Sequence, residues 1–407
     1  MSQPNYKKTK YSCYFAYLAM SAIFSLPPLL FLTFRNTYGI SYTLLGALVA
    51  INFCTQLTVD LVFSFFSKHF NIKKTVTIMP LITTLGLLIY ALVPWLLPNF
   101  AYFGLVAGTI VFSVAAGLCE VLLSPTVAAI PSDTPEKDMS MLHSLYAYGV
   151  VMVVVVSSIF LKIFGTQNWM YLTLFWAILP VVSFLLFKTS PMPDMNISHG
   201  EQTQGAKKRN FGLVLCVLCI FLGSAAENSM TNWISGYMEK ALNISKTVGD
   251  VLGMTTFAVL LGLGRTWYAK YGKNIINFLL MGMAGAAICY ITAGFSNNVI
   301  VSMIACVLTG WFTSMLWPGT LILMEEKVPG VGVAAYALMA AGGDFGASIA
   351  PMSLGVIVDV VSGSEWAMSI STMPEQIGMK TGMLAASIFP LLGVLLILFM
   401  KKYFKKS

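Results

Sequence analysis

The sequence predicts an all-α membrane protein with twelve transmembrane helices. Of its 407 residues, 57% are hydrophobic and 10% are charged, whereas soluble domains carry about 25% charged residues. The mean hydropathy is +0.79. A spanning helix needs about 20 mostly apolar residues. Twelve segments satisfy this requirement, at approximately 12–34, 42–66, 75–97, 101–128, 140–164, 168–187, 211–237, 246–269, 275–294, 298–324, 332–361 and 382–402.

The positive charges indicate the orientation of these helices. The net charge is +8, which in a soluble protein would suggest a nucleic-acid partner. If the N-terminus is cytoplasmic and the loops alternate, 19 of the 24 Lys and Arg residues fall on the inner side, as the positive-inside rule requires. We therefore expect both termini in the cytoplasm, a bacterial cytoplasmic (inner) membrane location, a lipid bilayer partner and no nucleic acid. The first span has no small-residue cleavage site near its end and is expected to be retained.

The second span carries three polar side chains. Asn52 and Gln56 form an i, i+4 pair and would share one helix face; we expect them to bind substrate, with helix packing as the alternative. Asp60 is close to the cytoplasmic end, where a gating contact with Arg265 or Lys68 is expected.

The fourth and fifth spans contain the next polar groups. Glu120 lies about 18 residues into its span, in the run Gly117-Leu-Cys-Glu-Val-Leu-Leu-Ser-Pro125. An ionisable group in the hydrocarbon region costs roughly 2.5 kcal/mol or more and usually marks a pathway. We expect Glu120 to couple transport to protons, with a protonated structural acid as the alternative. His143 is a second coupling candidate, and Tyr146 is a candidate for substrate binding; either could instead be an interfacial or packing residue.

The longest hydrophilic stretch separates two sets of six spans. Residues 188–210 include two prolines, two glutamines and the basic cluster Lys207-Lys208-Arg209, a composition typical of a flexible cytoplasmic linker. The sequence therefore predicts one six-helix bundle over 1–187 and a second over 211–407.

The seventh span has the most polar face. Glu227, Asn228, Asn232 and Trp233 lie within seven residues, and such side chains are poor neighbours for lipid. We expect them to line a substrate cavity, with hydrogen bonding between helices as the alternative.

The later spans supply the remaining candidates. Arg265 lies toward the end of the eighth span, where a long side chain can reach the interface, and is expected to act as a gate with Asp60. Trp317 could add aromatic cavity surface. Asp344 lies among small residues in the eleventh span, so proton coupling and a structural hydrogen bond are both open.

The two halves show an internal repeat. The frame of Gly117 and Pro125 returns 193 residues later as Gly310 and Pro318. Gly149 maps to Gly342 at the same offset. Two parallel six-helix repeats with a long inner loop between them are typical of major facilitator transporters.

Three patches carry a more specific resemblance. They are Gly117-x-x-Glu120 with Pro125, Leu142-His143-Ser-Leu-Tyr146 with Gly149, and Glu227 with Trp233 and Tyr237. With them the chain resembles the fucose permease-like branch of sugar:proton symporters in the major facilitator superfamily. The resemblance implies two pseudo-symmetric bundles and alternating access to a central site. Members of that branch carry an acid in the first helix, whereas here residues 11–34 have no charge.

The expected function is proton-coupled uptake of a neutral sugar. No Lys or Arg lies in the middle of a span, so the four acids lack obvious countercharges, and burial favours the protonated form of such a group. Asn, Gln, Glu and Trp suit an uncharged polyol. Proton-driven efflux of hydrophobic or cationic compounds, a sensor that binds without transport, and sodium as coupling ion stay open. An enzyme is not expected, nor a cofactor: Cys216-x-x-Cys219 lies within a span and is assigned to packing. A monomer is expected.

Overall fold

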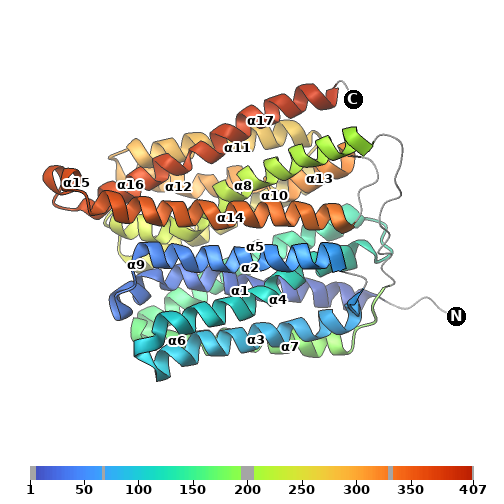
Figure 1. Ribbon diagram of the computed structural model, residues 1–407, viewed down its shortest axis with the longest axis horizontal. Coiled ribbons are helices and arrows are strands. Elements are labelled where there is room, and N and C mark those ends of the chain that lie inside the picture. Colours follow the sequence, from blue (N-terminus) through green and yellow to red (C-terminus); the bar gives the residue numbers. More distant parts are fainter. Residues whose placement is uncertain (1–5, 67–68, 194–205, 329–332, 406–407) are drawn as a thin grey trace.

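In the computed structural model, which describes residues 6–66, 69–193, 206–328 and 333–405, helices account for all regular secondary structure of the described residues. Twelve helical segments are long and apolar enough to cross a membrane, so the predicted number of spans is confirmed. Figure 1 shows them running along the longest axis, with α1 beginning and α17 ending at the same end of the bundle. We call this the terminal end, and the opposite end, where α15 (Glu365–Ile370) lies, the far end.

The first six spans form what we call the N-terminal half. They are α1 (Lys7–Tyr38), α2 (Tyr42–Phe66), α3 (Ile72–Leu96), α4 (Ala101–Ala128), α5 (Pro135–Phe164) and the consecutive pair α6 (Trp169–Trp176) and α7 (Ile178–Lys188).

The last six spans form the C-terminal half, and three of them are interrupted. They are α8 (Ala206–Lys240), α9 (Lys246–Val248) continuing through a π-helical turn (Gly249–Thr255) into α10 (Thr256–Tyr271), α11 (Ile275–Phe295), α12 (Val299–Thr313) with α13 (Pro318–Lys327), α14 (Val333–Ser362), and α16 (Pro374–Ala386) with α17 (Ile388–Lys405). Most of the expected linker, 194–205, lies outside the described residues, as does Lys68.

The repeated glycines occupy matching positions in the two halves. A Cβ at Gly117 of α4 would lie 3.0 Å from α2, and one at Gly310 of α12 would lie 2.3 Å from α10. Likewise, a Cβ at Gly149 of α5 would lie 2.5 Å from α1, and one at Gly342 of α14 would lie 2.7 Å from α8. Each pair joins corresponding helices of the repeat, because the fourth span packs on the second as the tenth does on the eighth. The absence of a side chain lets these helices approach closely.

The prolines of the same repeat differ in effect. Pro125 lies inside a continuous α4. Pro318 instead begins α13 after a turn at 314–317, so the tenth span is broken where the fourth is not. Since proline removes a main-chain donor, the broken span exposes carbonyl groups of the turn, and the oxygen of Ser314 is used in the site described below.

Candidate functional site

Two adjoining chambers lie between the halves of the bundle. The first, which we call the charged chamber, has Glu120, Glu227, Arg265, His143 and Asp344 among its lining residues and holds about 550 Å³ of empty space, including the part open to solvent. The second holds about 410 Å³ by the same measure. Both chambers are lined by residues from the two halves of the bundle.

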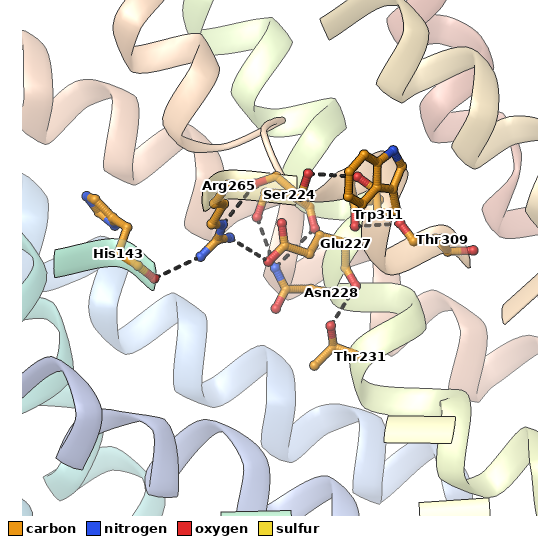
Figure 2. Close-up of polar contacts among 10 residues, drawn as sticks. His143, Ser224, Glu227, Asn228, Thr231, Arg265, Thr309 and Trp311 are labelled. Atoms are coloured by element: carbon orange, nitrogen blue, oxygen red, sulfur yellow. Dashed lines mark hydrogen bonds and ion pairs between the residues drawn. The ribbon is translucent and has the colours of Figure 1, made fainter. Parts of the chain in front are cut away.

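Arg265 is the central cation of the charged chamber. Its side chain is 7% exposed, and its Nη2 atom lies 3.3 Å from Oε1 of Glu227 on α8. The Nε atom donates to the main-chain oxygen of Ser314 at 2.9 Å, and Nη1 donates to that of His143 at 3.3 Å. Figure 2 shows the guanidinium group between His143 and Glu227. Three acceptors from three segments therefore fix its position.

This arrangement corrects two expectations. The expectation that the buried acids lack a permanent countercharge is wrong for Glu227, which is ion-paired with Arg265. The expected contact between Arg265 and Asp60 is not formed, because the guanidinium group is bound to Glu227 and two main-chain oxygens instead. The long side chain of Arg265 extends into the bundle rather than toward the membrane surface.

Glu120 faces the cavity without a cation. It lines the charged chamber and also a neighbouring pocket that reaches Pro125 and Tyr336 toward the terminal end. Within the described residues, it has no ion pair or hydrogen bond to another side chain. Glu120 and Glu227 thus lie in one chamber but in different surroundings. The carboxyl group of Glu227 is paired with a guanidinium group, whereas that of Glu120 faces the cavity.

Asp60 and Asp344 are fully buried across the contact between α2 and α14. Their carboxyl groups interact electrostatically with each other and with Glu120, and no other described side chain meets hydrogen-bond geometry with their oxygens. Asp344 lines the charged chamber, whereas Asp60 lies behind it. The two halves therefore meet here through two acids without a cation.

His143 contributes in two ways. Its ring lines the charged chamber and packs edge-on against Tyr17 of α1, with ring centroids 5.3 Å apart. Its main-chain oxygen accepts the hydrogen bond from Arg265 described above. Since α5 belongs to the N-terminal half and α10 to the C-terminal half, this bond joins the two.

The second chamber, which we call the amide chamber, is polar but has no charged side chain among its described lining residues. Its polar lining consists of Asn52, Thr109, Tyr146, Asn228, Thr231 and Asn232, and aromatic rings complete the wall. Asn52 accepts hydrogen bonds from Gln56 and Ser113 through Oδ1, which leaves its NH₂ group for the chamber. Gln56 is buried behind Asn52 and positions it.

The two tryptophan candidates are placed differently. Trp317 lines the charged chamber. Trp233 is 2% exposed and donates its indole N–H to the main-chain oxygen of Pro351 at 2.9 Å. It packs between Phe31 and Tyr42 and does not line either chamber. Trp233 therefore belongs to the contact between the halves on the far side of the cavity.

Several lining residues were not expected from the sequence, among them Tyr17, Phe24 and Thr109. Tyr17 and Phe24 are seven residues apart on α1, and Thr109 precedes Glu120 by eleven residues on α4. Both spacings place the two residues on one helix face. The position of Thr109 could therefore have been inferred from the sequence, because it shares a face of α4 with Glu120.

The far end is closed by contacts between the halves. Glu375 of α16 lies 3.2 Å from both Arg35 of α1 and Lys240 of α8. Asp359 of α14 accepts a hydrogen bond from the main-chain N–H of Thr43 at 2.6 Å. We call these contacts the far-end network.

The comparisons with known proteins agree with this architecture. The Major Facilitator Superfamily profile matches residues 12–351. Among solved structures, a D-xylose-proton symporter gives a TM-score of 0.76 at 16% identity, covering 98% of each chain. The fucose:proton symporter of E. coli gives 0.63 at 13% identity, covering 96% of this chain and 99% of the other.

A bacterial homolog of the human lysosomal transporter Spinster gives 0.71 at 13% identity, covering 100% of this chain and 99% of the other. No curated protein sequence matches the chain. The profile spans most of the chain, and the structural similarities show the same fold. The protein is therefore a member of the Major Facilitator Superfamily, a transporter of the membrane rather than an enzyme.

Proposed function

We propose that the protein takes up a small neutral polyol, of which a sugar is the best example, together with protons. The observation that carries this proposal is the division of the central cavity into an uncharged amide chamber and an acid-rich charged chamber. Phe24, Phe53, Tyr146 and Asn228 line both, so a solute in one chamber lies beside the ionisable groups of the other.

The amide chamber supplies the contacts that a polyol needs. Amide and hydroxyl groups of Asn52, Asn228, Asn232 and Tyr146 offer donors and acceptors without charge. The rings of Phe24 and Phe53, with centroids 5.7 Å apart, offer apolar surface for the C–H face of a sugar. A charged solute would have to exchange its hydration for neutral dipoles here, which costs free energy.

The charged chamber supplies the proton site. Glu120 faces the cavity without a countercharge, so protonation neutralises the group, whereas the charge of Glu227 is already balanced by Arg265. We assign proton binding to Glu120, with His143 and Asp344 at the same chamber as further members of the relay. Arg265 acts as a gate through its bond to His143, and Glu227 holds Arg265 in place. Binding and release then alternate between the membrane faces as the halves move about the cavity.

Thermal stabilisation of the purified protein tests the substrate class. L-Fucose, D-xylose, uridine and tetraphenylphosphonium are added separately, because any compound that binds the folded protein raises the midpoint by mass action. We expect a sugar to stabilise the protein and tetraphenylphosphonium not to. The stabilising sugar is then added to proteoliposomes with and without an inward proton gradient. Equal accumulation of the sugar under the two conditions would contradict proton coupling.

One observation favours a second function, proton-driven efflux of cationic compounds. The charged chamber has three carboxyl groups, those of Glu120, Glu227 and Asp344, and one guanidinium group. Such an excess of acid attracts cations. Stabilisation by tetraphenylphosphonium without any response to sugars or uridine would select this function.

A further inference from the structure

Two consecutive prolines lie within the continuous helix α1 beside the cavity. Pro27 and Pro28 lie inside the helix, and proline has no main-chain N–H. In an α-helix the carbonyl of residue 24 accepts from the N–H of residue 28, and in a tighter 3₁₀ turn from that of residue 27. Because both are prolines, the carbonyl of Phe24 has neither donor. The carbonyl of Ile23 loses only its α-helical donor, since Leu26 keeps an N–H within 3₁₀ reach.

No other group in the described part of the chain donates a hydrogen bond to the carbonyl oxygen of Phe24. No described side chain donates a hydrogen bond to it, and the next N–H along the helix, that of Leu29, has its regular acceptor in Ser25. An unpaired main-chain group at membrane depth costs several kcal/mol, and it is tolerated where it lines a water-filled cavity. The position of the carbonyl therefore matters.

The surrounding residues place the Phe24 carbonyl at the amide chamber. A helix carbonyl points along the axis toward the residue four positions later, so this one lies between Phe24 and the two prolines. Phe24, Pro27 and Pro28 all line the amide chamber, and Phe24 lines the charged chamber as well. The oxygen thus faces the cavity near the junction of the two chambers.

We propose that the main-chain oxygen of Phe24 is a substrate-binding acceptor that takes a hydrogen bond from a hydroxyl group of the transported polyol. This inference rests on the proposed function and adds a specific subsite to it. The ring of the same residue lies 5.8 Å from that of Tyr146, centroid to centroid, so one residue offers an acceptor beside an aromatic wall. A carbonyl has no charge and keeps its acceptor at any pH, which separates sugar binding from the proton site at Glu120.

Substitution of Pro28 tests the subsite directly, because it returns an N–H to the helix. In Pro28→Ala the new N–H takes the Phe24 carbonyl, and the Kd for L-fucose or D-xylose is expected to rise about tenfold, the effect of one hydrogen bond. Pro28→Val restores the same N–H with a different side chain and is expected to match it. Pro94→Ala is the control: it likewise returns an N–H to the interior of a spanning helix, α3, but Pro94 lines neither chamber, so the Kd stays within about twofold.

A main-chain ester separates the hydrogen bond from the shape of the helix. Lactic acid, introduced at position 28 by nonsense suppression, has the side chain of alanine but no N–H. We expect it to restore the wild-type Kd. The monodeoxy analogues of L-fucose then identify the hydroxyl group that donates to the Phe24 carbonyl. The analogue that lacks this hydroxyl group should bind wild type more weakly than L-fucose does, but should bind Pro28→Ala with the same Kd as L-fucose.

The outcomes distinguish the two proposals. If wild type binds a sugar but Pro28→Ala binds it equally well, or the ester behaves like alanine, the Phe24 subsite is refuted and the proposed function stands. If wild type responds to neither sugar, the proposed function fails and the subsite fails with it.

Discussion

Arg265 of α10 donates a hydrogen bond to the main-chain oxygen of His143 in α5, at 3.3 Å, across the contact between the two halves. The same guanidinium group is held within the C-terminal half by Glu227 and by the main-chain oxygen of Ser314. A change in the charge of Glu227 therefore acts on a group that also joins the halves. This links the state of one carboxyl group to a contact that joins the two halves.

The ion pair between Arg265 and Glu227 should dominate the stability of this region. Arg265→Met leaves the carboxylate of Glu227 buried without a partner, and breaking such a pair costs about 3–5 kcal/mol. Glu227→Gln should cost less, because the amide remains an acceptor for the guanidinium group. The double variant Arg265→Met with Glu227→Gln should recover much of the loss, since no buried carboxylate remains.

Thermal midpoints of the four proteins in one detergent give the coupling free energy. Arg265→Lys serves as the control for charge alone, because it keeps the cation and loses the planar fork that reaches three acceptors. Additive effects of the two single substitutions would contradict the pair.

Glu120→Gln should uncouple transport from protons. The amide keeps the size and polarity of the side chain but cannot bind a proton reversibly. Accumulation of the stabilising sugar against a gradient should fall to the level of equilibration, while exchange of labelled for unlabelled sugar across the membrane continues. Proteoliposomes with an imposed pH gradient measure both activities.

Glu326→Gln is the matched control for this substitution. Glu326 is an exposed acid at the end of α13, away from both chambers. Proteoliposomes with the Glu326→Gln variant should accumulate sugar as those with the wild type do. Gradient-driven accumulation by Glu120→Gln at the wild-type level would refute the role of Glu120.

Glu375 should hold the far end closed. It accepts from Arg35 and Tyr42 of the N-terminal half and lies 3.2 Å from Lys240 of its own half. Partly exposed ion pairs contribute roughly 0.2–1 kcal/mol each, so Glu375→Gln should shift the population toward an open far end by about two- to tenfold. The control is Glu365→Gln, an exposed acid in the first turn of α15.

Distances between spin labels report this shift. Labels at Phe100 and Ile300, both exposed at the far end, should separate in Glu375→Gln, and labels at Lys73 and Lys402 at the terminal end should approach. A background without the exposed Cys54 keeps labelling specific. Unchanged distance distributions in Glu375→Gln would show that the far-end network does not control closure.

The sequence predicts the spans and part of the cavity for one physical reason. A polar side chain in an apolar helix has to avoid lipid, so Asn52, Glu120, Asn228 and Asn232 had to face protein or water, and each lines a chamber. Hydropathy carries this information without any knowledge of packing. The same reasoning located the twelve helices.

The sequence does not predict where a side chain points or which distant residue it contacts. The sequence shows that Trp233 is amphipathic but not that its N–H is taken by the oxygen of Pro351, 118 residues later. Arg265 was placed at a span end by counting residues, yet its long side chain reaches acceptors on three segments. The far-end network joins Arg35 to Glu375 over 340 positions, and a contact of that separation leaves no local pattern.

The contact between Lys10 and Asp138 should make the stability of the N-terminal half depend on pH. Asp138 lies before the membrane-spanning part of α5, and its Oδ1 is 3.1 Å from Nζ of Lys10. Partial burial opposes ionisation of Asp138, but hydrogen bonds from Ser132, Lys10 and Tyr14 together with the charge of Lys10 outweigh it and lower the pKa. A carboxyl group with a lowered pKa contributes stability above its ordinary pKa of about 3.9 and loses it as the pH falls through the lowered value.

Asp138→Asn should therefore be less stable than wild type at pH 7, by about 1 kcal/mol or less for a partly exposed pair. Thermal midpoints between pH 7 and pH 3 should show the two proteins converging as the pH falls below 4, and a difference that is the same at both ends would show that the ionised carboxyl group contributes nothing.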